Sequence, residues 1–221
     1  MRFLKYPNSR ADMWSRRAFL SRTIVALAAS FGPPRLARAN DVPEQAANFI
    51  KSLADEVIAI LKNKSLGKDD RVRELARIFL EGFDVRAIGL FVLGTYARNL
   101  HEDERNKYID TFKDYVVETY AARFNTYAGE DFIVTASTPD GEKGAWVFTN
   151  IGLPGDEPTE VQWRVRGTPD GFKIVDVVVE GVSLVVTQRS EFAAVLQRNN
   201  GSVPALTALL HQKIDQLKSK S

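Results

Sequence analysis

The sequence predicts an α+β fold in which helices of the N-terminal half pack on an antiparallel sheet built by the C-terminal half. Apolar residues recur at helical spacing from residue 43 to about residue 127. From residue 131 onwards apolar and polar residues alternate, as they do in half-buried strands. Helices followed by strands, without regular alternation of the two, are typical of α+β domains.

Two helices are predicted at the start of this domain. Asp41 is a suitable cap for the first, which has Pro43 at an early position and ends before Gly67. The second ends at Gly82. The apolar stripe of the first comprises Phe49, Leu53, Val57, Ile60 and Leu61, and that of the second Val72, Leu75, Ile78 and Phe79.

A short and a long helix are expected next. Asp84 caps the segment Val85–Leu93, which is apolar almost all round, so we expect it to be buried on every side. A long amphipathic helix follows from about Glu102 to Tyr127. Its apolar face comprises Tyr108, Phe112, Tyr115, Val116, Tyr120 and Phe124.

The second half predicts a four-stranded antiparallel sheet. The tetrapeptide Thr-Pro-Asp-Gly occurs at residues 138–141 and again at 168–171. Pro presets φ, Asp bonds back to the backbone and Gly accepts a positive φ, so each copy predicts a hairpin turn. Two further helices close the chain, near 188–197 and 204–218. The predicted strands are Asp131–Ser137, Lys143–Leu153, Thr159–Arg166 and Phe172–Glu180.

Residues 1–39 are interpreted as an export signal that precedes the fold. A basic start is followed by a modestly apolar stretch, the breakers Gly-Pro-Pro and the small-residue site Ala37-Arg38-Ala39, after which we expect cleavage. Arg16 and Arg17 are followed, after Ala18, by the pair Phe19-Leu20, and this spacing is the pattern of a twin-arginine signal. The apolar run is too short to span a membrane. These features predict a periplasmic protein.

Removal of the signal changes the charge balance. It carries 8 Lys and Arg and 1 Asp, so residues 40–221 have 22 basic and 27 acidic residues, a net charge of −5. A nucleic-acid-binding domain is expected to keep a basic face, so nucleic acid is excluded as a partner. The absence of Cys removes disulfides and thiol chemistry. We expect one domain of 182 residues, monomeric and without a cofactor.

No catalytic or metal-binding set is evident. His101 and His211 lie far apart in sequence near predicted helix ends, where we expect surface positions. The acidic pair at 69–70 and the acidic triplet at 102–104 begin helices, where the helix dipole favours acids, so we interpret them as helix starts rather than metal ligands. Nucleotide-binding, hydrolase and metalloprotease motifs are missing. We therefore expect no enzymatic activity.

The sequence contains more apolar segments than a simple core requires. Gly89 and Gly94 leave room along the apolar helix for a close neighbour or a ligand. Ile174–Val179 is apolar on both faces apart from Asp176, and apolar residues continue past Gly181. These segments fit either a filled core or a cavity between sheet and helices, because periodicity does not distinguish the two.

Two motifs resemble those of the MlaC family. The first is Phe83-Asp84-Val85-Arg86-Ala87-Ile88-Gly89-Leu90-Phe91-Val92-Leu93-Gly94, and the second is Asp176-Val177-Val178-Val179-Glu180-Gly181-Val182-Ser183-Leu184. The resemblance covers essentially residues 43–217 and implies a periplasmic phospholipid carrier that maintains outer-membrane lipid asymmetry. The implied partners are a phospholipid ligand, an inner-membrane Mla-type ABC transporter complex and an outer-membrane lipoprotein–porin complex.

The resemblance also implies site residues. It places Val182 against the acyl tails and Leu90, Val92 and Leu93 near them. It places Arg98 and Arg105 on a charged docking surface. Strand alternation adds Trp146, Phe148, Trp163 and Ile174 as candidate lining residues. The twin arginines depart from the family, which usually carries an ordinary secretory signal.

Two other functions stay open at this stage. A carrier with the same fold could bind a rigid hopanoid-type lipid instead of a phospholipid. An enzyme acting on a small apolar substrate would need a polar pair deep in the cavity, for which Asp176 and Tyr120 are the candidates. The sequence fixes neither the head-group preference nor the direction of transport.

Overall fold

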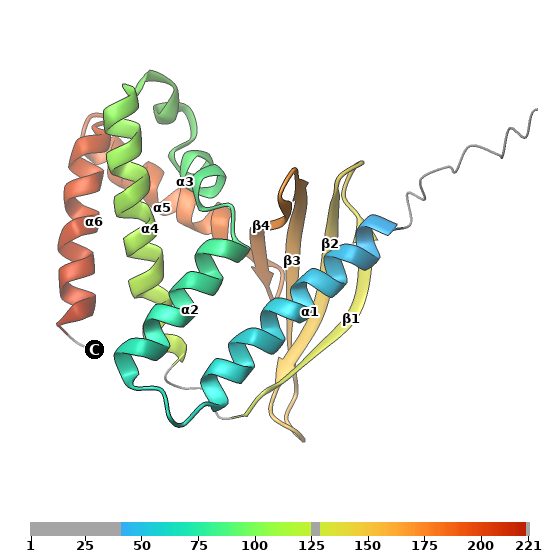
Figure 1. Ribbon diagram of the computed structural model, residues 1–221. Helices are drawn as coiled ribbons and strands as arrows, with labels where there is room; N and C mark the ends of the chain where they lie inside the picture. Colours follow the sequence, from blue (N-terminus) through green and yellow to red (C-terminus); the bar gives the residue numbers. More distant parts are fainter. Residues whose placement is uncertain (1–40, 125–128, 220–221) are drawn as a thin grey trace, which may run out of the picture. The chain divides into compact units, whose positions relative to one another are not determined.

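The structure, a computed structural model, describes residues 41–124 and 129–219. The elements follow the predicted order of helices, then strands, then helices (Figure 1). The helices before the sheet are α1 (Asp41–Lys62), α2 (Lys68–Gly82), α3 (Val85–Leu93), the 3₁₀ helix η1 (Gly94–Asn99) and α4 (Glu102–Phe124). The helices after it are α5 (Leu184–Arg198) and α6 (Val203–Lys218). The predicted signal, with its proposed cleavage site, lies outside the described residues.

The strands form one antiparallel meander in the order β1-β2-β3-β4-β5. The four predicted strands are confirmed, and a fifth strand of two residues was not predicted. Both Thr-Pro-Asp-Gly segments join neighbouring strands, with Gly141 at φ +72° and Gly171 at φ +118°. The strands are β1 (Asp131–Pro139), β2 (Gly144–Gly152), β3 (Thr159–Thr168), β4 (Gly171–Val179) and β5 (Val182–Ser183).

The helices bury two separate apolar clusters. One joins α1 to the sheet and contains Ala46, Ile50, Ala145, Val147, Val165 and Ile174. The other lies among α3, α4, α5 and α6 and contains Val92, Leu93, Tyr108, Phe112, Phe192, Leu196 and Leu206. In Figure 1, α4 and α6 run side by side, while α1 crosses the face of β1 and β2.

Local capping explains where the helices begin. The Asp84 carboxylate accepts a 2.9 Å hydrogen bond from the backbone N–H of Ala87, which confirms it as the cap of α3. Ser183 caps α5 in the same way, so this helix begins at Leu184 and not near residue 188 as predicted. Of the apolar residues after Gly181, Val182 therefore belongs to β5, whereas Leu184, Val185 and Val186 form the first turn of α5.

Gly89 answers one question that the sequence left open. A Cβ at this position would lie 2.7 Å from Ile109 Cδ1 and 3.0 Å from a ring carbon of Phe112, both on α4. Gly89 thus allows α4 to pack closely against α3, and the space beside it is not available to a ligand. The Tyr108 hydroxyl completes this contact by donating to the Gly89 carbonyl at 3.1 Å, and burial raises the pKa of Tyr108 well above its ordinary value.

Within residues 41–124 and 129–219, no helix is both long enough and apolar enough to cross a membrane.

Candidate functional site

A cavity of about 510 Å³ lies between the sheet and the helices. Helix α1 supplies Ile50, Leu53, Ala54, Val57, Ile58 and Leu61 to its wall, and α2 supplies Leu75, Ile78 and Phe79. Residues of α3, α4 and α5 line the other side, and the sheet contributes Phe132, Ile151, Trp163, Ile174, Asp176 and Val177. Its volume falls within the range of roughly 300–1,000 Å³ that is typical of small-molecule sites.

The lining is almost entirely hydrocarbon. Among the residues that the structure describes, its polar members are Tyr115, Thr119, Tyr120, Glu130, Asp176 and Gln188, and none is Lys, Arg or His. Thr119 donates to the backbone carbonyl of Tyr115 at 2.7 Å, so this hydroxyl is satisfied within α4. Burial raises the pKa of Tyr115, which keeps its hydroxyl neutral at physiological pH. Such a wall fits an apolar ligand.

Trp163 presents an apolar surface because its polar atom is satisfied elsewhere. The indole N–H donates to Thr149 Oγ1 at 2.9 Å, and that hydroxyl in turn donates to the carbonyl of Val161 at 3.0 Å. Thr149 is fully buried, so this short chain of hydrogen bonds runs inside the sheet layer. A buried Trp needs such a partner. Phe132 lies beside the indole, with 6.1 Å between ring centroids.

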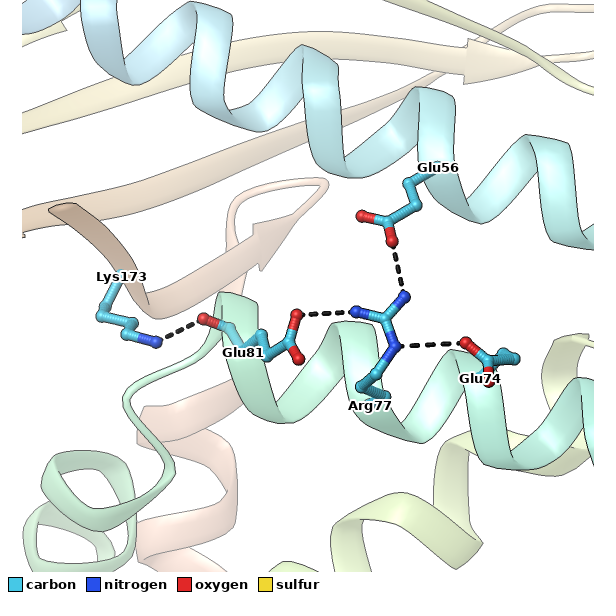
Figure 2. Close-up of polar contacts among 5 residues, drawn as sticks. All are labelled: Glu56, Glu74, Arg77, Glu81 and Lys173. Atoms are coloured by element: carbon cyan, nitrogen blue, oxygen red, sulfur yellow. Dashed lines mark hydrogen bonds and ion pairs between the residues drawn. The ribbon is translucent and has the colours of Figure 1, made fainter. Parts of the chain in front are cut away.

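The α1–α2 wall is held from outside by an ionic cluster centred on Arg77 (Figure 2). Its guanidinium contacts Glu56 of α1 at 2.6 Å, and Glu74 and Glu81 of its own helix at 3.1 and 2.7 Å. The hydrogen bonds to Glu56 and Glu74 raise the pKa of Arg77 above its ordinary value. Lys173 of β4 donates to the backbone carbonyl of Glu81, which ties the end of α2 to the sheet.

Three of the predicted lining residues border the cavity. Val92, Trp163 and Ile174 are all part of its wall, and Val92 and Ile174 are each 1 % exposed. Leu90 and Leu93 of the same apolar helix instead pack into the cluster among the helices. Contact of any of them with a lipid stays a prediction.

Trp146 and Phe148 lie outside the lining, and the register between β2 and β3 explains why. Trp163 is paired with Val147, so the β2 residues on its face are the odd-numbered ones, and Ala145 and Val147 pack under α1. Trp146 and Phe148 project from the opposite face and are half-buried. There the guanidinium of Arg164 stacks on Trp146 at 5.5 Å from the ring centroid. Alternation identified two apolar faces without telling which one the helices cover.

Val182 also lies outside the lining and is 56 % exposed. It pairs with Val179 in the β4–β5 hairpin, directly before the first turn of α5. Its neighbours after Ser183, Leu184 and Val185, do line the cavity. Val182 is therefore next to the cavity wall along the chain, and its contact with an acyl tail stays a prediction.

The two predicted docking residues differ in their surroundings. Arg98 is exposed at the end of η1. Arg105 is half-buried in the first part of α4, where its Nη2 donates to the carbonyl of Leu100 at 3.1 Å. Both therefore flank the connection between η1 and α4, which Arg105 also stabilises, and their docking role stays a prediction.

Sequence reasoning missed the contribution of α1 and α2, which supply about a third of the lining. The apolar stripe of each helix was recognised in the sequence, but it was not linked to a cavity. The same holds for Phe112, Tyr115 and Val116 of α4, which turn their apolar face towards the cavity. An apolar stripe indicates that one side of a helix is shielded from water. It does not indicate whether protein side chains or a ligand fill the space beside that side.

The residues considered for polar chemistry are placed as follows. His101 and His211 are exposed and are not part of the lining, and His211 Nε2 lies 3.1 Å from Thr111 Oγ1. The acidic residues at 69–70 and 102–104 stand in the first turns of α2 and α4. In the part of the chain that the structure describes, no group of three or more His, Asp or Glu is arranged to hold a metal ion.

Comparison with known proteins gives this fold and cavity a context. The structure of a phospholipid-binding protein from Ralstonia solanacearum, solved in complex with a phospholipid, is similar with a TM-score of 0.70 and 20 % sequence identity. The match covers 79 % of this chain and 99 % of that one, and at this identity it shows a shared fold. The model of the family described as MlaC protein matches residues 51–212, from within α1 to within α6. The chain therefore belongs to the MlaC family.

Proposed function

We propose that this protein is a periplasmic carrier that binds one phospholipid in the apolar cavity and shuttles it between the inner and outer membranes. The observation that carries the proposal is the cavity of about 510 Å³, whose described lining residues are nearly all apolar and include no basic side chain. Such a lining suits acyl tails and offers no partner for a buried phosphate. The head group would thus remain at the surface.

The energetics of tail transfer support a closed apolar site. A phospholipid with two tails exposes about 30 methylenes, each of which costs roughly 0.8 kcal/mol in water. Moving a bare lipid through the aqueous periplasm would therefore cost on the order of 20 kcal/mol. A carrier has to cover most of that surface. Five helices and the sheet surround the cavity from different directions, which is the arrangement that this requires.

The similarity to known proteins also supports a phospholipid ligand. The chain belongs to the MlaC family, and the Ralstonia solanacearum protein of the same fold was solved with a phospholipid bound. The proposed route, from an Mla-type ABC transporter at the inner membrane to a lipoprotein–porin complex at the outer membrane, follows the family resemblance. The signal proposed at residues 1–39 would bring a monomeric carrier to the compartment between them.

We propose a carrier and not an enzyme because the polar residues of the lining are engaged in structure. Both carboxylate oxygens of Asp176 accept hydrogen bonds from the start of α5. That leaves this residue poorly suited to act as a general base. Tyr120, the other residue considered for catalysis, also has an interaction partner.

Native mass spectrometry of the exported protein, followed by organic extraction, tests the proposal. We expect one phospholipid per chain, and transfer of a labelled phospholipid from donor to acceptor vesicles at a rate that increases with protein concentration. Extraction of a hopanoid instead of a phospholipid would show that the protein is a lipid carrier with a different ligand. Protein that contains no lipid, takes none up and accelerates no transfer would refute the proposed function.

A further inference from the structure

Asp176 and Glu130 are the two carboxylates among the described residues of a largely apolar wall, and the hydrogen bonds of Asp176 explain its presence there. Its Oδ1 accepts from the backbone N–H of Val177 at 2.8 Å and of Val185 at 3.3 Å. Its Oδ2 accepts from the hydroxyl of Ser183 at 2.7 Å. Two of these three donors belong to the junction between β5 and α5. The carboxylate of β4 therefore holds the start of the next helix.

Ser183 extends this connection into α5. While its hydroxyl donates to Asp176, its oxygen accepts from the backbone N–H of Val186 at 3.0 Å. Ser183 is thus the N-cap of α5, and Asp176 fixes the orientation of the cap. A carboxylate close to a helix N-terminus is also favoured by the helix dipole. The result is a chain of contacts from β4 through Ser183 to the first turn of α5.

The short strand β5 gives this junction little support of its own. It pairs with β4 through two residues only, Val182 and Ser183. The loop between the strands consists of Glu180 and Gly181, with φ values of +49° and +80°. Positive φ at both positions is the conformation of a two-residue type I′ hairpin, and Glu180 adopts it without the freedom of a glycine. The hydrogen bonds of Asp176 therefore provide the support for this junction that the short strand pairing does not.

The first turn of α5 is also part of the cavity. Leu184, Val185 and Gln188 all line it, next to Val177 of β4. Loss of the Asp176 contacts would leave the helix attached through its packing on α3 but would release this first turn from the sheet. The cavity wall would then lose its fixed shape at the place where α5 meets β4.

On this basis we propose that Asp176 is a positioning residue of the lipid site. Through Ser183 and the backbone of Val185, it fixes the first turn of α5 as a rigid wall of the cavity and thereby sets the affinity for lipid. The proposal rests on the proposed function as a phospholipid carrier. It assigns to the Asp of the Asp-x-x-x-Glu-Gly-Val-Ser segment a structural task at the ligand, without direct contact between the carboxylate and the lipid.

The chain offers a matched control, because α6 is capped in the same way. Ser202 Oγ accepts from the backbone N–H of Ala205 at 3.2 Å, and no residue of α6 lines the cavity. Ser183→Ala and Ser202→Ala therefore remove the same kind of cap from two helices, only one of which borders the ligand. Asp176→Leu removes the whole connection, whereas Asp176→Asn keeps an oxygen for the backbone N–H groups and can still hydrogen-bond to Ser183.

Delipidated wild-type protein and the four variants would be titrated with a phosphatidylethanolamine that carries one pyrene-labelled acyl chain. Asp176→Leu and Ser183→Ala should weaken uptake at least about tenfold, equivalent to ~1.4 kcal/mol. Ser202→Ala and Asp176→Asn should bind close to wild type, although Ser202→Ala loses thermal stability to a similar extent as Ser183→Ala. Hydrogen exchange of the amides of Val185 and Val186 should accelerate in Asp176→Leu and not in Ser202→Ala.

The outcomes separate this inference from the proposed function. Wild-type protein that takes up no labelled phospholipid refutes the proposed function itself. If wild type binds and Ser202→Ala loses as much affinity as Ser183→Ala, cap loss acts through global stability and the positioning role is wrong. Wild-type affinity in both Ser183→Ala and Asp176→Leu would refute it as well. If Asp176→Leu fails to fold, the comparison of Ser183→Ala with Ser202→Ala still decides the question.

Discussion

Filling the cavity from its own wall should change lipid binding and stability in opposite directions. Ala54 of α1 lines the cavity, and Ala54→Phe would project six additional ring carbons into it. If each carbon displaces about one methylene of an acyl tail, at roughly 0.8 kcal/mol per methylene, lipid binding should weaken by about 5 kcal/mol. That corresponds to a roughly 10³–10⁴-fold loss of affinity, an upper value because a flexible tail can shift.

The same substitution should stabilise the lipid-free protein. Filling a cavity commonly contributes about 0.5–2 kcal/mol. The lower helix propensity of Phe relative to Ala offsets about 0.5 kcal/mol of this gain. The remaining ~1 kcal/mol corresponds to a rise in Tm of about 2–4 °C for a domain of this size.

Thermal melts of the delipidated protein and displacement of a fluorescent acyl probe measure the two effects. Ala59→Phe is the control, because Ala59 lies on the same helix but is exposed and outside the lining. Ala59→Phe should leave lipid affinity unchanged and should lower stability only by the helix-propensity cost of about 0.5 kcal/mol. Unchanged lipid affinity in Ala54→Phe together with a lower Tm would mean that Ala54 borders tightly packed core, and the cavity would not be the lipid site.

Three further predictions concern export, lipid contact and docking. Replacing both Arg16 and Arg17 by Lys should leave precursor in the cytoplasm. Cell fractionation that shows normal export of this variant would contradict the twin-arginine interpretation. Val182→Glu should keep its circular dichroism spectrum, since the side chain is 56 % exposed, and should lose phospholipid from its organic extract if Val182 contacts the tails. Retained lipid would place Val182 outside the site. Replacing both Arg98 and Arg105 by Glu should slow lipid exchange with membrane partners while lipid stays bound. The exposed charge of Arg98 affects association more than stability, and the half-buried Arg105 supports the η1–α4 connection, which is outside the cavity lining. Loss of lipid in that variant would argue against a docking role.

Local chemistry made much of the fold predictable from the sequence. The bounds of α3 follow from Asp84 as its cap and from an apolar run that ends at Gly94, and both features act within a few residues. The two Thr-Pro-Asp-Gly segments determine their hairpins in the same way, since Pro, Asp and Gly each set their own backbone. The family resemblance also rests on contiguous motifs. These features need no knowledge of what lies opposite them in space.

The composition of the cavity was decided by tertiary structure alone. Its wall joins residues 50–61 of α1 with residues 174–177 of β4, more than a hundred positions apart, and no local signal reports that approach. Periodicity marked Trp146 and Trp163 as apolar strand residues alike, and only the covering by α1 decided that one faces inwards and the other outwards. Gly89 served a neighbouring helix instead of a ligand because Ile109 and Phe112 pack against it. An apolar side chain leaves water whether it packs into a filled core or lines a cavity. Whether a cavity remains depends on how closely the assembled helices and strands pack against one another. The sequence of each separate element does not specify that packing.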